Sequence, residues 1–392
     1  MNIFYDENMP FAKEFFGDFF GEQTQLTAFN GRTLTADDVA CADVLLVRSV
    51  TKVNQALLAQ NKNLAFVGTA TIGVDHIEQS YLSSRDITFT ASPGCNAISV
   101  AEYVLSSLVI LSEKYNFSLK DKTVGIIGGG NTGTRTSEKF KALGIDYKIC
   151  DPLLAEQGDS REFVTIEEIL SCDIISLHVP LTRTGEHPTY HLLNEERLKQ
   201  LKPEQILINA CRGEVIDNQA LLALKQDGYE TKLVLDVWEN EPNILMPLIE
   251  YAEIASAHIA GYSLEGKSRG TEMLYQALCR KFEKTITKSL TDFLPEPDIA
   301  VTKINSNFSE ILLNQTVKMV YDVRRDDAIF RQQISDFGFD HIRKTYPVRR
   351  EFSSLSIIEE IESNIENSIN TNQTKLQPLY ELGFKQTPLE EV

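Results

Sequence analysis

Short apolar runs alternate with stretches of helical periodicity through the first hundred residues. Runs rich in β-branched and aromatic residues predict strands at residues 3–5, 44–47, 65–68 and 87–90. Apolar positions at helical spacing predict helices at residues 9–16 and 54–60. Strands that alternate with helices form parallel sheets covered by helices. We therefore expect the chain to begin with a doubly wound α/β domain of the flavodoxin-like kind.

A second α/β block follows a long apolar stretch at residues 98–111, which predicts a buried helix. Further short apolar runs predict strands at residues 123–127, 147–150, 174–177, 206–209, 233–235 and 254–257. This succession is typical of a complete Rossmann domain with a doubly wound parallel sheet. A helical stretch at residues 265–290 follows, and Pro295 and Pro297 then mark a linker because proline cannot continue a helix.

These patterns predict three domains. The first comprises residues 1–97 together with about 263–290, and the second comprises residues 98–262. The remaining residues, 291–392, have a mixed pattern that includes a charged helix around 316–326 and a strand at 354–358. We expect this last part to be a small α+β domain.

Composition narrows the classes of function. The chain has 392 residues and a formal net charge of −18, so the phosphates of a nucleic acid would be repelled over most of its surface. An anionic substrate would need a local basic pocket for the same reason. The six cysteines are scattered without zinc spacing, which predicts reduced thiols in a cytoplasmic protein without a metal. Glu102 and Ser106 interrupt an apolar run that is too short to span a bilayer, so we expect no membrane segment.

A glycine-rich turn lies between the strand predicted at 123–127 and a helix predicted from about residue 134. Gly128 permits a tight turn, Gly130 lets the backbone approach a pyrophosphate, and Gly133 allows close packing of helix on strand. Asn131 and Thr132 lie at the helix start, where free N–H groups attract phosphate. The next strand ends at Asp151, whose carboxylate suits the adenosine ribose and would repel the extra phosphate of NADP. This arrangement predicts NAD, with a simple Asp-Pro turn as the alternative interpretation of Asp151.

Three later strands end in polar groups that suit hydride transfer from a 2-hydroxy acid. Arg212 offers a bidentate guanidinium for the substrate carboxylate. His258 offers a base that titrates near neutrality for the hydroxyl proton, and Glu241 can orient the imidazole and stabilise its cation. Taken singly, Arg212 is as easily a surface charge, Glu241 a loop carboxylate and His258 a hydrogen-bonded histidine at a strand end. Together, beyond the carboxyl ends of strands in one sheet, they predict a catalytic set.

Four segments, GIIGGGNTG, NACRGEVID, LDVWENEP and SAHIAGYS, resemble the D-isomer-specific 2-hydroxyacid dehydrogenase family. The resemblance implies two α/β domains that flank a cleft, with the Arg–Glu–His set acting together. Further segments, among them DENMPFAKEFF, VGTATIGVDHI, SPGCNAISVAEYV, HIAGYSLEGKSRGTEM and YDVRRDDAIF, resemble one branch of that family. That branch oxidises a 4-phosphorylated 2-hydroxy acid in the biosynthesis of pyridoxal phosphate, as a homodimer held by its C-terminal domain.

The resemblance also implies roles for further residues. Substrate contacts are implied for Ser49 and Thr71 in the first domain and for Tyr262 near the hinge. The nicotinamide side is implied to be lined by Ala210, Cys211, Arg212, Asp236 and Gly261, with Val179 under the adenosine. It also raises the chance that Arg324, Arg325, Asp326 and Asp327 belong to a subunit interface, and the alternative is a self-paired helix surface.

The substrate phosphate needs cations of its own. Arg48, beside Ser49, is our main candidate, with Lys52 close by. Arg349 and Arg350 are a second source, reaching the site from the partner subunit. The alternatives are that Arg48 pairs with a carboxylate such as Asp6 and that the C-terminal arginines are a solvated charge run.

Two other functions remain open at this stage. The chain could be another 2-hydroxyacid dehydrogenase, such as a phosphoglycerate dehydrogenase, or an NAD-sensing protein without turnover. The complete Arg212, Glu241 and His258 set favours an enzyme.

Overall fold

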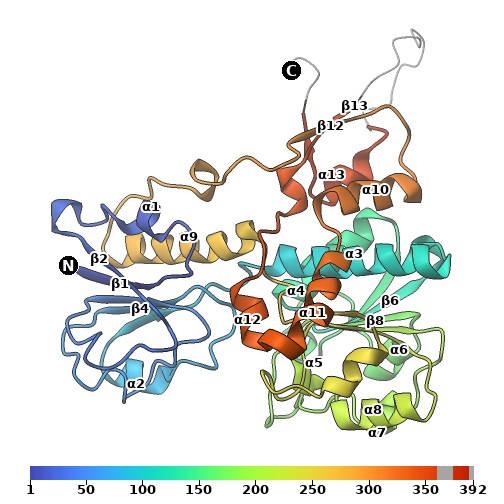
Figure 1. Cartoon of the computed structure of the whole chain (residues 1–392), viewed down its shortest axis with the longest axis horizontal. Coiled ribbons are helices and arrows are strands. Elements are labelled where there is room, and N and C mark those ends of the chain that lie inside the picture. The colour runs from blue at the N-terminus through green and yellow to red at the C-terminus, as the bar shows by residue number, and fades with distance from the viewer. Residues whose placement is uncertain (360–373, 388–392) are drawn as a thin grey trace. The chain divides into compact units, whose positions relative to one another are not determined.

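A computed structural model describes residues 1–359 and 374–387 of the chain (Figure 1). The chain divides into two compact units: Met1–Asn96 with Tyr262–Pro295, and Ala97–Gly261 with Glu296–Val392. None of the helices in the described ranges combines the length and hydropathy that a bilayer crossing requires. The described C-terminal residues group with the second unit, and their status as a separate domain stays a prediction.

The first unit is built on five parallel strands in the order β2-β1-β3-β4-β5, which is the flavodoxin-like order. Their bounds are β1 Asn2–Asp6, β2 Gln25–Phe29, β3 Val44–Val47, β4 Phe66–Thr69 and β5 Thr88–Thr90. Helices α1 (Ala12–Phe16), α2 (Gln79–Ser84) and α9 (Leu264–Lys281) complete the unit. Aromatic residues of α1 pack against Leu274, Tyr275 and Leu278 of α9, so the returning helix is part of this core.

Two predictions in the first unit were wrong. The helix expected at residues 54–60 is a series of turns, in which the side chain of Asn54 accepts a hydrogen bond from the Leu57 N–H (3.0 Å) and competes with helical bonding. The helix expected to reach residue 290 ends at Lys281, where Glu283 takes a left-handed conformation (φ 53°). Strand β2 was not predicted because it lies at the sheet edge and is mostly exposed.

The second unit is built on six parallel strands in the order β11-β10-β9-β8-β6-β7. Their bounds are β6 Thr123–Ile127, β7 Asp146–Cys150, β8 Ile174–Leu177, β9 Ile206–Asn209, β10 Lys232–Leu235 and β11 Ala252–Ala255. Beyond β7, Val164 donates its N–H to the Ile149 carbonyl (2.9 Å) where a Rossmann sheet carries its third strand. The predicted Rossmann strands are confirmed to within about two residues.

Helices cover this sheet. They are α3 Ala97–Tyr115, α4 Asn131–Ala142, α5 Pro152–Glu156, α6 Ile166–Leu170, α7 Glu195–Leu198 and α8 Asn218–Gln226. The apolar stretch predicted as a buried helix is α3, which is buried over most of its length.

The described C-terminal residues form a parallel three-stranded sheet and short helices. The strands are β12 Val301–Ile304, β13 Ser356–Glu359 and β14 Lys385–Gln386, and the helices are α10 Glu310–Val320, α11 Arg324–Phe337, α12 Phe339–Lys344 and α13 Gln377–Glu381. The single helix expected at 316–326 is wrong, because extended Tyr321 separates α10 from α11 and donates its hydroxyl to Asp326 (2.7 Å). Residues 360–373 and 388–392 of the predicted third domain lie outside the described residues.

The C-terminal segment completes the core of the second unit. Phe330, Phe339 and Ile342 belong to one apolar cluster with Trp238, and the rings of Phe330 and Trp238 stack at 5.6 Å. Removing this segment would therefore expose apolar surface of the second unit.

A buried network of charges also fixes the C-terminal segment. The Arg349 guanidinium lies 3.9 Å from the centre of the Tyr321 ring and donates to the Ser99 carbonyl (2.5 Å). Glu351 accepts from the Ser99 hydroxyl (2.9 Å), and Glu102 accepts from the Phe352 N–H (3.0 Å). Arg349 is only 2% exposed, so the prediction that it reaches a phosphate was wrong, and so was the alternative of a solvated charge.

Candidate active site

The glycine turn of the second unit has the geometry of a dinucleotide cradle. Gly128 has φ 99°, and a Cβ there would lie 2.6 Å from the His178 carbonyl oxygen. A Cβ on Gly133 would lie 1.9 Å from the Gly128 oxygen, whereas Gly130 faces open space. Close approach to neighbouring backbone therefore requires glycine at Gly128 and Gly133, whereas Gly130 leaves its backbone accessible to a pyrophosphate. Asn131 and Thr132 form the first residues of α4, as predicted.

Asp151 lies at the end of β7 beside this turn. Its carboxylate accepts hydrogen bonds from the Gly129 N–H (2.8 Å) and from the Leu154 N–H (3.1 Å), which caps α5. Asp151 therefore caps α5 as part of an Asp-Pro turn and also lies beside the glycine turn. The role as a turn former is thus compatible with the predicted role as a ribose ligand.

Arg161 is a neighbour of the turn that the sequence did not indicate. Its guanidinium donates to the Gly129 carbonyl and to the Thr134 hydroxyl, both at 2.9 Å. Asp159 binds the same guanidinium at 2.8 Å, so the cation is held in place and its charge is matched. Gly129, Thr134 and Arg161 line a hollow of about 360 Å³ at the start of α4.

Arg212 follows β9, as predicted, in a turn that is fixed by its neighbours. The side chain of Asn209 donates to the Arg212 carbonyl (3.0 Å). A Cβ on Gly213 would lie 1.9 Å from the Trp238 carbonyl carbon, so this turn lies directly against the loop that follows β10. Only glycine permits that approach, which brings the Arg212 turn to the loop that carries Glu241.

Val179 follows β8, and Ala210 and Cys211 follow β9 directly before Arg212. A Cβ on Gly128 would meet the Val179 side chain at 2.9 Å. Burial raises the pKa of Cys211 to about 11, against weaker opposing effects from Arg212 and Val179. The thiol is therefore protonated at neutral pH and is a poor nucleophile.

Glu241 and His258 contact each other through one imidazole nitrogen and one carboxylate oxygen. The His258 Nδ1 lies 2.7 Å from Glu241 Oε2, while Glu241 Oε1 accepts the Trp238 N–H at 2.9 Å. Burial raises the pKa of Glu241, but the charge and hydrogen bond of His258, the Trp238 N–H and the charge of Arg343 together lower it below its ordinary value. The carboxylate is thus ionised at neutral pH, and Nδ1–H is the form of the imidazole that it favours.

Asp236 organises the loop that carries His258. Its carboxylate is buried and accepts hydrogen bonds from Ser256 Oγ (2.6 Å), the Ile259 N–H (2.7 Å) and the Ala260 N–H (2.9 Å). These bonds hold His258 in a left-handed conformation (φ 56°). Gly261 ends the same loop, and contacts of Asp236 and Gly261 with a nicotinamide stay predictions.

Arg343 is a residue near this pair that sequence reasoning missed. It lies on α12 beside Ile342, which packs in the same apolar cluster as Trp238. Its Nε atom is buried, and its charge contributes to the ionisation of Glu241. No motif signals this residue, because α12 lies about a hundred residues after Glu241 in the chain.

One further histidine has two carboxylate neighbours. His191 Nε2 lies 2.8 Å from Glu239, and its Nδ1 lies 3.6 Å from Asp217. One possible ligand atom from each of His191, Asp217 and Glu239 therefore lies within 4.8 Å of the other two.

The predicted substrate residues of the first unit lie at the carboxyl ends of its strands. Arg48 and Ser49 follow β3, and the guanidinium carbon of Arg48 lies 5.9 Å from the centre of the Tyr262 ring. Thr71 follows β4, where its hydroxyl lies 2.8 Å from that of Thr69 and donates to the Gly73 carbonyl (2.9 Å). In a parallel sheet this edge is where ligands bind.

The alternative pairing of Arg48 with Asp6 is wrong. Asp6 is fully buried, and its Oδ1 accepts from the backbone and side chain of Asn8. Its Oδ2 has no hydrogen-bond partner among the described residues. The Asp6 carboxylate is therefore not engaged by Arg48.

Comparisons with known proteins agree with this geometry. The profile of the "D-isomer specific 2-hydroxyacid dehydrogenase, NAD binding domain" family matches residues 109–260, and a domain of unknown function (DUF3410) matches residues 293–376. An erythronate-4-phosphate dehydrogenase of Colwellia psychrerythraea is 60% identical over 91% of this chain and 95% of its own length. That of Pseudoalteromonas atlantica is 47% identical over 98% of this chain and 99% of its own length.

Solved structures show the same fold. A D-lactate dehydrogenase from Aquifex aeolicus, complexed with NAD and lactic acid, is 27% identical with a TM-score of 0.57. The match covers 72% of this chain and 96% of that one. An NAD-bound 3-phosphoglycerate dehydrogenase of Entamoeba histolytica is 23% identical with a TM-score of 0.60, over 72% and 95% of the two chains. NAD is the cofactor of this chain, and the chain belongs to the D-isomer-specific 2-hydroxyacid dehydrogenase family, among the erythronate-4-phosphate dehydrogenases.

Proposed function

We propose that the chain oxidises 4-phospho-D-erythronate to 2-oxo-3-hydroxy-4-phosphobutanoate with NAD, as a step in the biosynthesis of pyridoxal 5′-phosphate. The names of relatives that match over almost the whole chain support this substrate. The observation that carries the reaction type is the 2.7 Å contact between His258 Nδ1 and Glu241. It leaves Nε2 of the imidazole as the free base that oxidation of an alcohol requires.

Each residue of the set has one task. Arg212 binds the substrate carboxylate through two parallel hydrogen bonds and so orients the carbon that reacts. His258 Nε2 accepts the proton of the 2-hydroxyl, and Glu241 stabilises the imidazolium that results. NAD, when bound, accepts the hydride from the same carbon. Arg343 helps to keep Glu241 ionised whether the imidazole is neutral or charged.

The cofactor is proposed to lie along the carboxyl edge of the second sheet. The N–H groups at Gly130, Asn131 and Thr132 would hold the pyrophosphate, as the open space at Gly130 allows. Asp151 would bind the adenosine ribose, for which its carboxylate retains free lone pairs. By resemblance, we continue to assign the nicotinamide side of the site to Ala210, Cys211, Arg212, Asp236 and Gly261.

We also propose a cytoplasmic homodimer that pairs through the C-terminal segment. Exposed apolar side chains support a contact surface there, since Ile311 is 73% and Val348 67% exposed. The charged run at the start of α11 is largely paired within the chain, because Arg324 binds Asp322 and Arg325 binds Asp326. The self-paired alternative for that run is therefore favoured over a role in the interface.

The test is NADH formation from a panel of acids. We expect turnover with 4-phospho-D-erythronate and at most weak turnover with 3-phosphoglycerate or D-lactate. Preference for 3-phosphoglycerate would assign the chain to another branch of the family. NAD binding without turnover of any acid would favour the sensing function.

A further inference from the structure

One face of helix α11 lies against the strand that leads to His258. Asp327, Phe330 and Arg331 occupy the i, i+3 and i+4 positions of this helix, so their side chains share a face. The Asp327 carboxylate accepts a hydrogen bond from the N–H of Ala255, the last residue of β11, at 2.8 Å. Because β11 lies at the sheet edge, this N–H finds its acceptor on the helix rather than on another strand.

Arg331 completes the contact between α11 and β11. Its Nε donates to both oxygens of Asp327, one helical turn earlier, at 2.9 and 3.0 Å. Its two terminal nitrogens donate to the Ile249 carbonyl (2.9 Å) and to the Ala252 carbonyl (2.7 Å). Ala252 is the first residue of β11, so Arg331 binds the start of the strand and Asp327 binds its end. We call Asp327 and Arg331 the α11 clamp.

Phe330 extends the same face of α11 to the loop that carries Glu241. Its ring is fully buried and stacks on the Trp238 ring, with centres 5.6 Å and planes 24° apart. The backbone N–H of Trp238 donates to Glu241 Oε1 (2.9 Å), and its indole Nε1–H donates to the Ser256 carbonyl (2.8 Å). Ser256 directly follows β11, so Trp238 connects the Glu241 loop with the segment that carries His258.

Helix α11 is itself anchored in the core of the second unit. Ser106 of α3 donates its hydroxyl to the Tyr321 carbonyl (2.9 Å) and accepts the Val323 N–H (3.2 Å) just before the helix begins. In the first turn of α11, the buried Asp326 carboxylate accepts the hydroxyls of Tyr321 (2.7 Å) and Tyr346 (2.8 Å). A helix fixed in this way can hold the groups that bind to its face in one position.

We propose that α11 is a positioning element for the reaction. The α11 clamp fixes the strand that leads to His258, and Phe330 fixes the loop that carries Glu241, so the helix sets the alignment of these two side chains. The proposal rests on the proposed function, in which His258 is the base and Glu241 is its partner. It gives the segment matched by a domain of unknown function, residues 293–376, a role in catalysis within its own chain.

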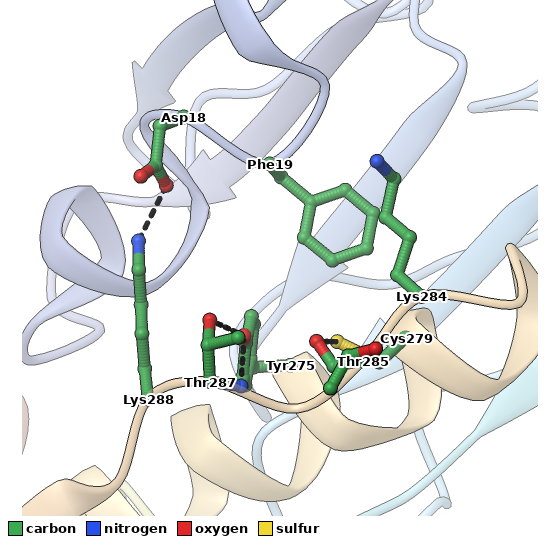
Figure 2. Close-up of a pocket in the computed structure, with 8 residues that line it drawn as sticks. All are labelled: Asp18, Phe19, Tyr275, Cys279, Lys284, Thr285, Thr287 and Lys288. Carbon is green, nitrogen blue, oxygen red and sulfur yellow. Dashed lines mark hydrogen bonds and ion pairs between the residues drawn. The ribbon is translucent and has the colours of Figure 1, made fainter.

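A clamp of the same kind in the first unit provides the matched control (Figure 2). Lys288 is bonded to Asp18 and also donates to the Glu14 carbonyl (2.6 Å) and the Phe15 carbonyl (3.4 Å). Like Arg331, it joins one carboxylate and two backbone carbonyls, here beside a hollow of about 280 Å³. These residues have no assigned part in substrate binding, NAD binding or proton transfer. Lys288→Gln therefore removes a comparable clamp and leaves the face of α11 intact.

The experiment measures kcat, KM for 4-phospho-D-erythronate and NAD affinity. Asp327→Ala should lower kcat about 10- to 100-fold, because a small displacement of a catalytic group is costly. KM and NAD affinity should be unchanged, since β10, β9 and β8 separate β11 from the strand that precedes the glycine turn. Asp327→Asn keeps an acceptor for the Ala255 N–H and should retain most of kcat. Lys288→Gln should match the wild-type kcat, whatever its effect on thermal unfolding.

A double variant separates positioning from a general loss of stability. If the α11 clamp acts through His258, Asp327→Ala should not lower the residual rate of His258→Gln any further, so the two losses are not additive. Additive losses, or equal losses of kcat in Asp327→Ala and Asp327→Asn, would overturn the proposal and leave the proposed function intact. A loss of kcat in Lys288→Gln as large as that in Asp327→Ala would also contradict it.

If the wild type shows no turnover, or if His258→Gln keeps the wild-type rate, the proposed function fails. The α11 clamp is then tested by proton NMR of the hydrogen-bonded His258 Nδ1–H, which is identified by the loss of its signal in His258→Gln. A signal that is shifted or broadened in Asp327→Ala, but unchanged in Asp327→Asn and Lys288→Gln, would support the positioning role. The same signal in all three variants would contradict it.

Discussion

Replacing Glu241 by glutamine tests the pairing at the centre of the proposed mechanism. The two carboxylate oxygens have different partners, since Oε1 accepts the Trp238 N–H (2.9 Å) and Oε2 faces His258 Nδ1 (2.7 Å). Glutamine offers one acceptor and one donor group. If the amide NH2 of the glutamine faces the Trp238 N–H, two donors meet. If it faces His258, Nδ1 must accept a hydrogen bond and the imidazole proton moves to Nε2. The second outcome removes the base.

The magnitude follows from the charge that is lost. Two opposite charges about 4 Å apart attract by about 4 kcal/mol at an effective dielectric constant near 20. The His258 side chain is 32% exposed, so solvent screening reduces this to about 2–4 kcal/mol. We expect kcat with 4-phospho-D-erythronate to fall by roughly 30- to 1,000-fold. NAD affinity should be unchanged, because the glycine turn is untouched.

The assay is steady-state NADH formation, with NAD affinity measured separately in the same variant. Glu241→Asp is the matched control, since it keeps the charge and shortens the side chain, and it should retain more activity than Glu241→Gln. A Glu241→Gln enzyme within threefold of the wild-type kcat would refute the reasoning.

Three further predictions concern the surroundings of the site. Asp151→Arg should weaken NAD binding and improve NADP binding, and unchanged affinities in Asp151→Ala would make this residue a cap only. Arg343→Gln should lower kcat about fivefold, because roughly 1 kcal/mol of electrostatic stabilisation of the Glu241 carboxylate is lost, and Arg343→Lys should retain the wild-type kcat. An equal loss of kcat in both variants, measured together with their thermal unfolding, would show that Arg343 contributes through packing alone. A chain that ends at Thr291 should aggregate or lose its fold, because it lacks Phe330 and Arg349. If light scattering and circular dichroism showed a soluble, folded dimer, the proposed dimerisation role of the C-terminal segment would be contradicted.

Buried regular elements could be predicted from the sequence. Strands such as β6, β8 and β9 are wholly or mostly apolar and end in sharp turns, so their bounds matched the pattern. Edge strand β2 was missed because it lies at the sheet edge and Phe29 is its one buried residue, so no buried apolar run marks it. The helix expected at 54–60 failed because the Asn54 side chain forms a local turn that periodicity does not register.

The site was predictable where its residues lie in contiguous motifs. Glu241 and His258 stand at strand ends of a recognisable block, and the structure brings them together. Arg343 lies far from Glu241 in the sequence, so only three-dimensional packing places it near this pair. Arg349 was misplaced because a pair of adjacent arginines looks solvated in sequence, whereas here Tyr321 and Ser99 bury one of them.

The central claim is that His258 is the proton acceptor in oxidation of a phosphorylated 2-hydroxy acid. The most direct measurement is the initial rate of NADH formation from 4-phospho-D-erythronate by the wild type and by His258→Gln, with NAD affinity measured in both. We predict turnover by the wild type, a loss of at least about 100-fold in His258→Gln from removal of the general base, and unchanged NAD affinity. Near-wild-type turnover by His258→Gln would contradict the account.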